Sequence, residues 1–183
     1  MSNVCVFCGS RHGRNPDYTR LAHNLGAALA EQGHGLVYGG GRVGLMGVMA
    51  DAAMAAGGKV LGVIPESLES REVGHRNITR LEVVSDMLSR KQRMIELSDA
   101  FIALAGGLGT LDELFEVLTW RQLGLIDEPI ILLDPFEDFT GIRSWMDHAC
   151  RQGFMDPEHR DMLVVAHSPQ EALEQLTPRA AAS

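Results

Sequence analysis

Hydrophobic positions along the chain fall into short continuous runs that alternate with longer stretches of helical spacing. The short runs predict buried strands over Val4–Cys8, Gly35–Tyr38, Lys59–Ile64, Leu81–Val84, Ala100–Ala105, Ile130–Leu133 and Leu163–Val165. The longer stretches predict helices over Tyr18–Gln32, Gly44–Ala56, Asp86–Leu97, Thr110–Leu123, Phe139–Gln152 and Pro169–Leu176. Strands that alternate with helices indicate an α/β fold with a mostly parallel sheet covered by helices.

Two segments show no convincing period. Glu66–Arg80 is rich in charge and is predicted to be a long loop, a kind of segment that is commonly functional. Thr177–Ser183 is predicted to be a frayed tail. The length of 183 residues favours one domain, which we place at residues 1–176.

The charge balance restricts the possible partners. A net charge of −8 argues against a nucleic-acid partner, which would require clustered cations, but not against one small anion held by backbone N–H groups. No apolar run approaches the roughly 18 residues of a membrane span, so no membrane partner is expected.

The chain has three cysteines, Cys5, Cys8 and Cys150. An odd number without a signal peptide favours a reducing, cytoplasmic location. Cys5 and Cys8 have the spacing of a redox or metal motif, but on a strand they point to opposite faces, and no second cluster completes a metal site. We therefore expect buried strand cysteines and no metal.

Two glycine-rich turns, Gly39–Gly47 and Gly106–Thr110, each connect a predicted strand to a predicted helix. Glycine lets the backbone approach a ligand closely, and the helix that follows offers N–H groups and a positive dipole end. Neither turn has the P-loop pattern, and the first lacks GxGxxG spacing. Tight turns alone could explain the glycines, but two such helix starts at one sheet edge favour phosphate binding.

The same topology brings Arg90 and Glu113 to this edge, although they are far apart in the sequence. A carboxylate beside a sugar phosphate can activate water or stabilise an oxocarbenium-like transition state, and an arginine can clamp phosphate or hold the carboxylate. Two alternatives stay open from the pattern alone. Thr110 and Glu113 have the spacing of a capping box, and Arg90 could belong to a solvated helix face with Lys91 and Arg93.

Three motifs, in this order, resemble one family: Gly39-Gly40-Gly41 through Gly44-Leu45-Met46-Gly47, then Met87-Leu88-Ser89-Arg90-Lys91, then Gly106-Gly107-Leu108-Gly109-Thr110-Leu111-Asp112-Glu113. The chain resembles the LONELY GUY (LOG) family of cytokinin riboside 5′-monophosphate phosphoribohydrolases, once labelled lysine decarboxylases. The match covers Val4 to about Pro129 and continues more loosely beyond it.

The resemblance implies a Rossmann-like three-layer sandwich with a mostly parallel central sheet. It also implies cleavage of N6-substituted AMP into a free adenine-type base and ribose 5-phosphate, without a metal or organic cofactor. The partner would be a nucleoside monophosphate, and the chain is expected to form a homodimer. Two alternatives are a broader purine 5′-nucleotide nucleosidase that takes plain AMP and a non-catalytic nucleotide carrier.

Carried over by position, Arg90 and Glu113 take the catalytic roles. Substrate- or phosphate-binding roles fall to Ser10, Gly40, Gly41, Gly44, Glu72, Lys91, Gly106, Gly107, Leu108, Gly109, Thr110 and Thr119. His75, in the predicted loop, is expected to be solvated and is given no role. The family has proline where this chain has Ala105, but the N–H donors that follow are retained, so function is expected to survive. A pyridoxal-dependent decarboxylase needs a Schiff-base lysine, and neither Lys59 nor Lys91 falls in an evident site for one.

Overall fold

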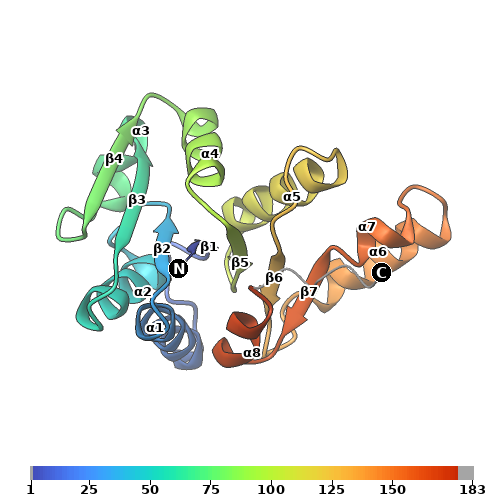
Figure 1. The fold of residues 1–183 in the computed structure, drawn as a ribbon, viewed down its shortest axis with the longest axis horizontal. Helices are drawn as coiled ribbons and strands as arrows, with labels where there is room; N and C mark the ends of the chain where they lie inside the picture. The colour runs from blue at the N-terminus through green and yellow to red at the C-terminus, as the bar shows by residue number, and fades with distance from the viewer. Residues whose placement is uncertain (1, 177–183) are drawn as a thin grey trace.

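The computed structural model describes residues 2–176, apart from the side chains of residues 70–72, so the predicted tail lies outside the described residues. Figure 1 shows the elements: β1 (Asn3–Phe7), α1 (Pro16–Glu31), β2 (Gly35–Tyr38), α2 (Gly44–Ala55), β3 (Val60–Pro65), α3 (Glu66–Glu72), β4 (Arg80–Val84), α4 (Met87–Glu96), β5 (Ala100–Ala103), α5 (Leu108–Gln122), β6 (Ile130–Leu133), α6 (Thr140–Arg151), α7 (Pro157–Arg160), β7 (Leu163–Ala166) and α8 (Pro169–Glu174). Within the described range, no helix is both long and apolar enough to cross a membrane.

The seven strands form one sheet in the order β4-β3-β2-β1-β5-β6-β7, and every neighbouring pair is parallel. The chain runs outward from β1 to β4, returns through α4, and runs from β5 to β7 on the other side. The predicted α/β fold with a parallel sheet is therefore confirmed. The order reverses between β1 and β5, where Val4 pairs with Ala100 and Phe7 with Ala103. Loops that leave these two strands diverge and open a crevice at their carboxyl ends.

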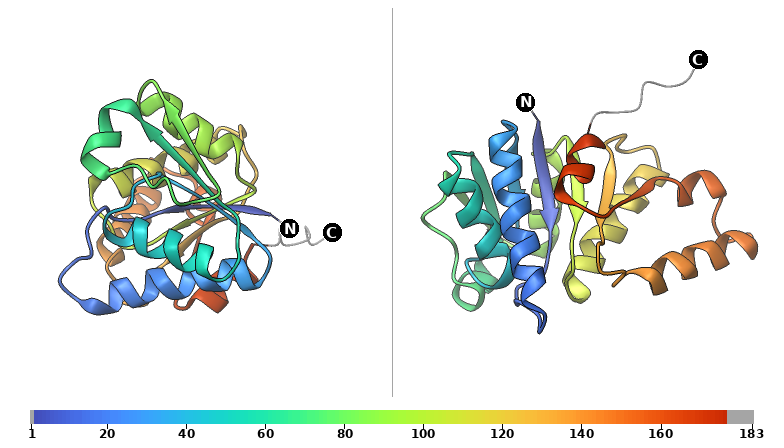
Figure 2. Two further views of the ribbon diagram at one scale, coloured as in Figure 1. Left: turned by 90° about the vertical axis from the view of Figure 1, so that its left-hand side faces the viewer. Right: turned by 90° about the horizontal axis from the view of Figure 1, so that it is seen from below.

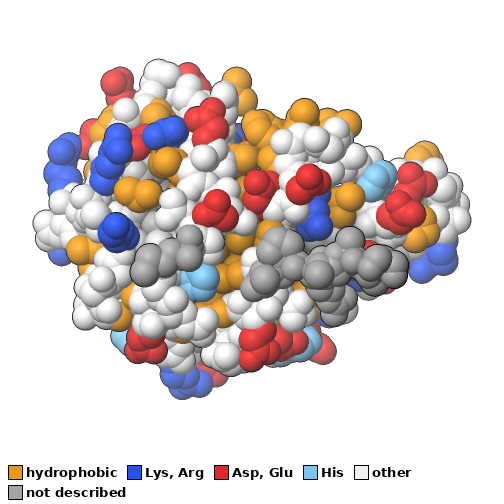
Figure 3. All heavy atoms as spheres, in the orientation of Figure 1, with side chains coloured by type: hydrophobic (Ala, Val, Ile, Leu, Met, Phe, Trp, Pro, Cys, Tyr) orange, Lys and Arg blue, Asp and Glu red, His pale blue; other side chains and the backbone are white. Residues whose placement is uncertain are grey.

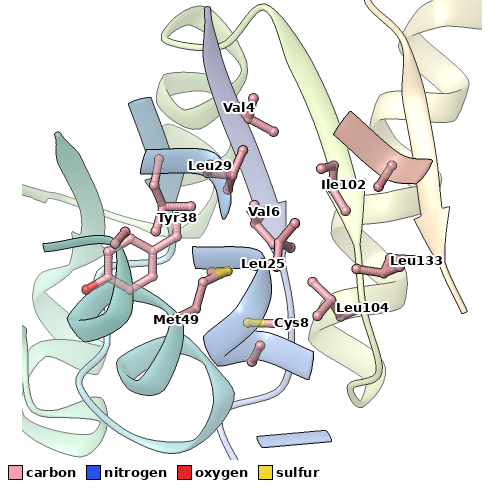
Figure 4. Close-up of a cluster of buried hydrophobic side chains, with 14 of the residues drawn as sticks. Val4, Val6, Cys8, Leu25, Leu29, Tyr38, Met49, Ile102, Leu104 and Leu133 are labelled. Carbon is pink, nitrogen blue, oxygen red and sulfur yellow. The ribbon is translucent and has the colours of Figure 1, made fainter. Parts of the chain in front are cut away.

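Helices cover both faces of the sheet, as the views in Figure 2 show. One hydrophobic core lies between the sheet and α1, α2 and α8, and the other lies between the sheet and α4, α5 and α6. Figure 4 shows part of the first core, with Leu25, Leu29 and Met49 packed on strand residues such as Val6. Cys5 belongs to the second core and Cys8 to the first, and both thiols are buried and free. The prediction that both cysteines are buried and point to opposite faces is confirmed, although β1 ends at Phe7 and Cys8 is the residue after it.

The segment after β3 is a helix where the sequence predicted a loop. Glu66–Glu72 form α3 directly after Pro65, with Glu66 and Glu69 in the first turn, where carboxylates complement the positive end of the helix dipole. Seven residues are too few to show a helical period, and Arg80 already begins β4. The short helix α7 was not predicted either, because its four residues are too few to show a helical period.

Candidate active site

A cavity of about 740 Å³ lies at the carboxyl ends of β1 and β5. It is lined by the loops after β1, β2, β5 and β6 together with side chains from α4 and α5. This volume falls in the range of small-molecule sites, and the reversal of strand order is where parallel α/β sheets bind ligands.

The second glycine-rich turn forms one wall of the cavity. Gly107 is the N-cap of α5, and Gly106, Gly107, Leu108, Gly109 and Thr110 all line the space. A Cβ on Gly106 would lie 2.0 Å from the Thr110 hydroxyl, so only glycine lets the turn fold against this side chain. The first N–H groups of a helix lack intrahelical partners, which makes this wall suited to an anion.

Ala105, which replaces the family's proline, is anchored by its backbone. Its carbonyl oxygen accepts a hydrogen bond from the amide of Gly9 at 3.0 Å, which ties the loop after β5 to the loop after β1. A Cβ on Gly106 would also approach the Gly9 nitrogen to 3.0 Å. This backbone bond holds the start of the turn in place without a proline ring at position 105.

Arg90 lies in α4 and is 6% exposed. Asp86 caps the start of this helix, and its side chain accepts from the amide of Ser89 at 2.8 Å; this bond lowers the pKa of Asp86. The guanidinium of Arg90 donates from Nε to the Val63 carbonyl at 3.2 Å and from Nη2 to the Gly39 carbonyl at 3.0 Å. Two strand ends therefore fix its plane, and the solvated-face interpretation of Arg90 is wrong.

Glu113 lies in α5, is 9% exposed, and has its Oε1 atom 3.8 Å from Nη1 of Arg90. The capping-box alternative is excluded because α5 begins at Leu108 and takes Gly107 as its N-cap, so Thr110 is already inside the helix. Burial raises the pKa of both Cys5 and Cys8, and the negative charge of Glu113 raises it further. The structure thus brings the two predicted catalytic side chains together, and both are buried.

The glycines of the first glycine-rich turn are closely packed against neighbouring segments. Gly40 has φ 75° and packs on Ile64, while a Cβ on Gly44 would lie 2.2 Å from the carbonyl carbon of Ser10. Ser10 and Gly39 line the cavity, whereas Gly40, Gly41 and Gly44 do not.

Of three further residues with predicted binding roles, two lie outside the cavity lining, and the side chain of the third is not described. Lys91 pairs with Asp112 at 3.2 Å and with Glu116 at 2.5 Å, which joins α4 to α5 outside the cavity lining. Burial lowers the pKa of Lys91, but these hydrogen bonds outweigh it and raise the pKa overall. Thr119 is exposed and donates to the Phe115 carbonyl at 2.7 Å. Glu72 ends α3, but its side chain lies outside the described residues.

Several lining residues were missed by the sequence analysis: Arg11, His12, Gly13, Tyr18, Met87 and Asp138. Tyr18 donates its hydroxyl to Oδ1 of Asp138 at 2.7 Å, a bond that raises the pKa of Tyr18 and ties α1 to the loop after β6. The available signal was position at the carboxyl edge: Arg11, His12 and Gly13 follow β1, Asp138 follows β6, and Tyr18 and Met87 lie in the first turn of α1 and α4.

Known proteins resemble this chain over most of its length. A family profile described as "Possible lysine decarboxylase" matches residues 46–176. A relative from Rhodococcoides fascians, named cytokinin riboside 5′-monophosphate phosphoribohydrolase, is 49% identical over 89% of this chain and 83% of its own length. LOG1 of Arabidopsis thaliana, with the same name, is 43% identical over 94% of this chain and 81% of its own. The chain belongs to the LOG family. The two relatives are named as phosphoribohydrolases, whereas the family profile keeps the older description as a possible lysine decarboxylase.

Solved structures confirm the fold. The X-ray structure of TM1055 is similar with a TM-score of 0.69 at 24% identity, covering 95% of this chain and 97% of that one. A molybdenum cofactor binding protein from Rippkaea orientalis is similar with a TM-score of 0.71 at 25% identity, covering 94% and 93%. The solved structures therefore support the Rossmann-like fold that the resemblance to the LOG family implied.

The decarboxylase description does not fit the cavity. A pyridoxal cofactor needs a lysine for its Schiff base, yet neither of the two lysines is among the lining residues. Lys59 directly precedes β3 and so lies at the opposite edge of the sheet, and Lys91 is engaged with α5. In the described part of the chain, no group of three or more His, Cys, Asp or Glu side chains is placed to hold a metal ion.

Proposed function

We propose that this LOG-family chain hydrolyses the N-glycosidic bond of N6-substituted adenosine 5′-monophosphates, releasing the free base and ribose 5-phosphate. The observation that carries this proposal is the buried Arg90–Glu113 pair, which shares one cavity with the glycine wall of α5. The phosphoribohydrolase names of relatives at 42–49% identity support it.

In this proposal the 5′-phosphate binds the N–H groups of Gly106 to Thr110 at the start of α5, with Ser10 in the adjoining loop after β1. The ribose then lies over Glu113, and the carboxylate activates water or stabilises positive charge that develops at C1′. The water oxygen bonds to C1′, the C1′–N9 bond breaks, and the departing base takes up a proton. Arg90 holds the carboxylate in place, since its own plane is fixed by two backbone carbonyls.

The substrate test compares AMP with N6-isopentenyl-AMP, measuring free base and ribose 5-phosphate after incubation with purified protein. Faster release from the N6-substituted nucleotide is expected. Equal rates would indicate the broader purine nucleosidase. Tight binding of both nucleotides with no base release would favour a carrier, a function worth testing because the similar Rippkaea orientalis protein is named for binding a cofactor. The binding roles that the resemblance gives Gly40, Gly41, Gly44, Glu72, Lys91 and Thr119 stay predictions.

We also propose that the protein acts as a homodimer in the cytoplasm. An apolar cleft between α5 and α6 is lined by Leu111, Phe115, Gly141, Ile142 and Trp145, and the Trp145 side chain is 54% exposed. Figure 3 shows hydrophobic side chains reaching the surface over α5. A second copy would cover this face next to the cavity, since Leu111 and Ile142 line both. The three free cysteines suit a reducing compartment.

A further inference from the structure

A short segment after α3 lies against the first glycine-rich turn. The amide of His75 donates to the Gly40 carbonyl at 2.9 Å, and the amide of Arg42 donates to the Val73 carbonyl at 3.1 Å. Gly41 and Gly74 form an antiparallel bridge between these two bonds. Residues 73–75 thus act as a strap that pairs with residues 40–42.

The strap is anchored from the side by His75. The position of this side chain in a predicted loop suggested that it is solvated, but it is 1% exposed, and its Nε2 atom lies 2.9 Å from Oδ1 of Asp51 in α2. A carboxylate only accepts hydrogen bonds, so Nε2 is the nitrogen that carries the proton in this contact. The expectation failed because the partner lies 24 residues away in sequence. A buried polar group requires such a partner, so this contact fixes the position of the strap.

The strap also holds a strained backbone conformation. Val73 has φ 49°, a left-handed value that is unfavourable for a β-branched residue. Such a conformation persists only where surrounding contacts determine it, and such residues cluster at functional sites. Here those contacts are the bond from the Val73 amide, as the C-cap of α3, to the Glu69 carbonyl, together with the bond from Arg42 and the anchor at His75.

The strap pairs with the same glycine-rich turn that accepts a hydrogen bond from Arg90. The carbonyl of Gly39 accepts from Nη2 of Arg90 at 3.0 Å, and the next residue is Gly40, which His75 binds. A continuous set of contacts therefore runs from Asp51 through His75 and the turn to Arg90 and Glu113.

We propose that His75, anchored by Asp51, is a positioning residue that sets the orientation of Arg90 beside Glu113. Its catalytic consequence rests on the proposed function, whereas its structural consequence at Arg90 does not. Neither His75 nor Asp51 lines the cavity, so the effect is transmitted through the backbone of Gly39 and Gly40.

The structural test uses the Arg90 Nε–H signal in NMR spectra of the full chain. Nε donates to Val63 in a buried site, so the signal should exchange slowly with water. His75→Ala should accelerate this exchange, and so should Asp51→Ala, which removes the acceptor for Nε2 of His75. His23→Ala, the same change at an exposed histidine of α1, should leave the signal unchanged. If His75→Ala proves unstable, Asp51→Ala decides, because Asp51 is an exposed side chain.

The kinetic test measures base release from N6-isopentenyl-AMP. His75→Ala should lower kcat roughly 10–100-fold, the scale of a displaced catalytic group, while leaving the affinity for ribose 5-phosphate unchanged. His75→Gln, whose amide can still donate to Asp51, should recover part of the loss. Adding His75→Ala to Arg90→Lys should cost much less than it costs the wild type, because one group acts through the other.

The outcomes separate the two proposals. A wild-type protein without base release contradicts the proposed function, and the NMR result then decides the positioning role alone. A folded His75→Ala with an unchanged Arg90 signal and unchanged kcat overturns the positioning role. Additive losses with Arg90→Lys would also overturn it.

Discussion

The carbonyl oxygen of Gly39 lies 3.0 Å from Nη2 of Arg90, and a Cβ at position 39 would lie only 1.9 Å from the same nitrogen. The strand that supports the guanidinium therefore requires glycine at its end. This is a steric requirement of the neighbouring side chain, because Gly39 does not have a positive φ.

Gly39→Ala should displace Arg90 and lower kcat for base release about 100-fold, as expected when a catalytic group moves by roughly an ångström. The control is Gln92→Ala, at an exposed position of α4 that lines neither the cavity nor the apolar cleft. A Gly39→Ala enzyme as active as this control would show that the guanidinium contact does not matter to turnover.

Gly109→Ala should separate binding from stability. No protein atom lies within 4 Å of a Cβ built on Gly109, and the residue is in the first turn of α5, where alanine is a better helix former. The Tm should therefore stay constant or rise, while affinity for ribose 5-phosphate, measured by calorimetry, falls about tenfold through lost contact with the anion. Unchanged affinity would mean that the phosphate does not approach this part of the turn.

The edge strand β4 should be stabilised by a pH-dependent ion pair. Glu82 accepts from Arg93 at 2.8 Å and also contacts Arg80, and the hydrogen bond from Arg93 holds the pKa of Glu82 below its ordinary value of 4.5. A lowered pKa means that the stabilisation is complete above the ordinary pKa and is lost as the pH falls through the lowered one.

Glu82→Gln should accordingly lower the Tm by about 1–3 °C at neutral pH, the scale of a partly exposed ion pair in a chain of this size. The difference from wild type should shrink as the pH falls through the lowered pKa of Glu82, because the wild-type side chain then loses its charge as well. Melting curves from neutral pH down into acid check this. A difference that persists in acid would assign the effect to packing.

Trp145→Asp should convert the proposed dimer to a monomer, because it places a charge in the apolar cleft where Trp145 packs edge-on against Phe115. Phe154→Asp is the control, since Phe154 is 87% exposed and lies outside that cleft. Sedimentation velocity distinguishes the two. A wild-type monomer, or a Trp145→Asp protein that stays dimeric, would contradict the proposed interface.

Much of this arrangement follows from the sequence because it depends on topology. The apolar runs and glycine turns determine where each parallel strand ends. These strand ends are enough to predict that Arg90 and Glu113 lie at one edge of the sheet. The capping-box ambiguity could not be resolved in this way, because it depends on whether α5 begins at Leu108 or at Thr110.

The hydrophobic pattern of the sequence does not predict long-range contacts between polar side chains. The burial of His75 depends on Asp51, and the wall formed by Tyr18 depends on Asp138, 120 residues away. Neither pair has a periodic signature. The helix α3 was missed because a seven-residue helix carries no period.

The most direct measurement of the central claim is single-turnover base release from N6-isopentenyl-AMP by Glu113→Gln. The change keeps the shape of the side chain and removes its charge, so ribose 5-phosphate should still bind. The account predicts a rate about 10²–10⁴ times lower than wild type, the usual contribution of a general base. Glu96→Gln, at an exposed glutamate of α4, should match wild type. A Glu113→Gln protein that releases base at the wild-type rate would contradict the assignment of this carboxylate to catalysis.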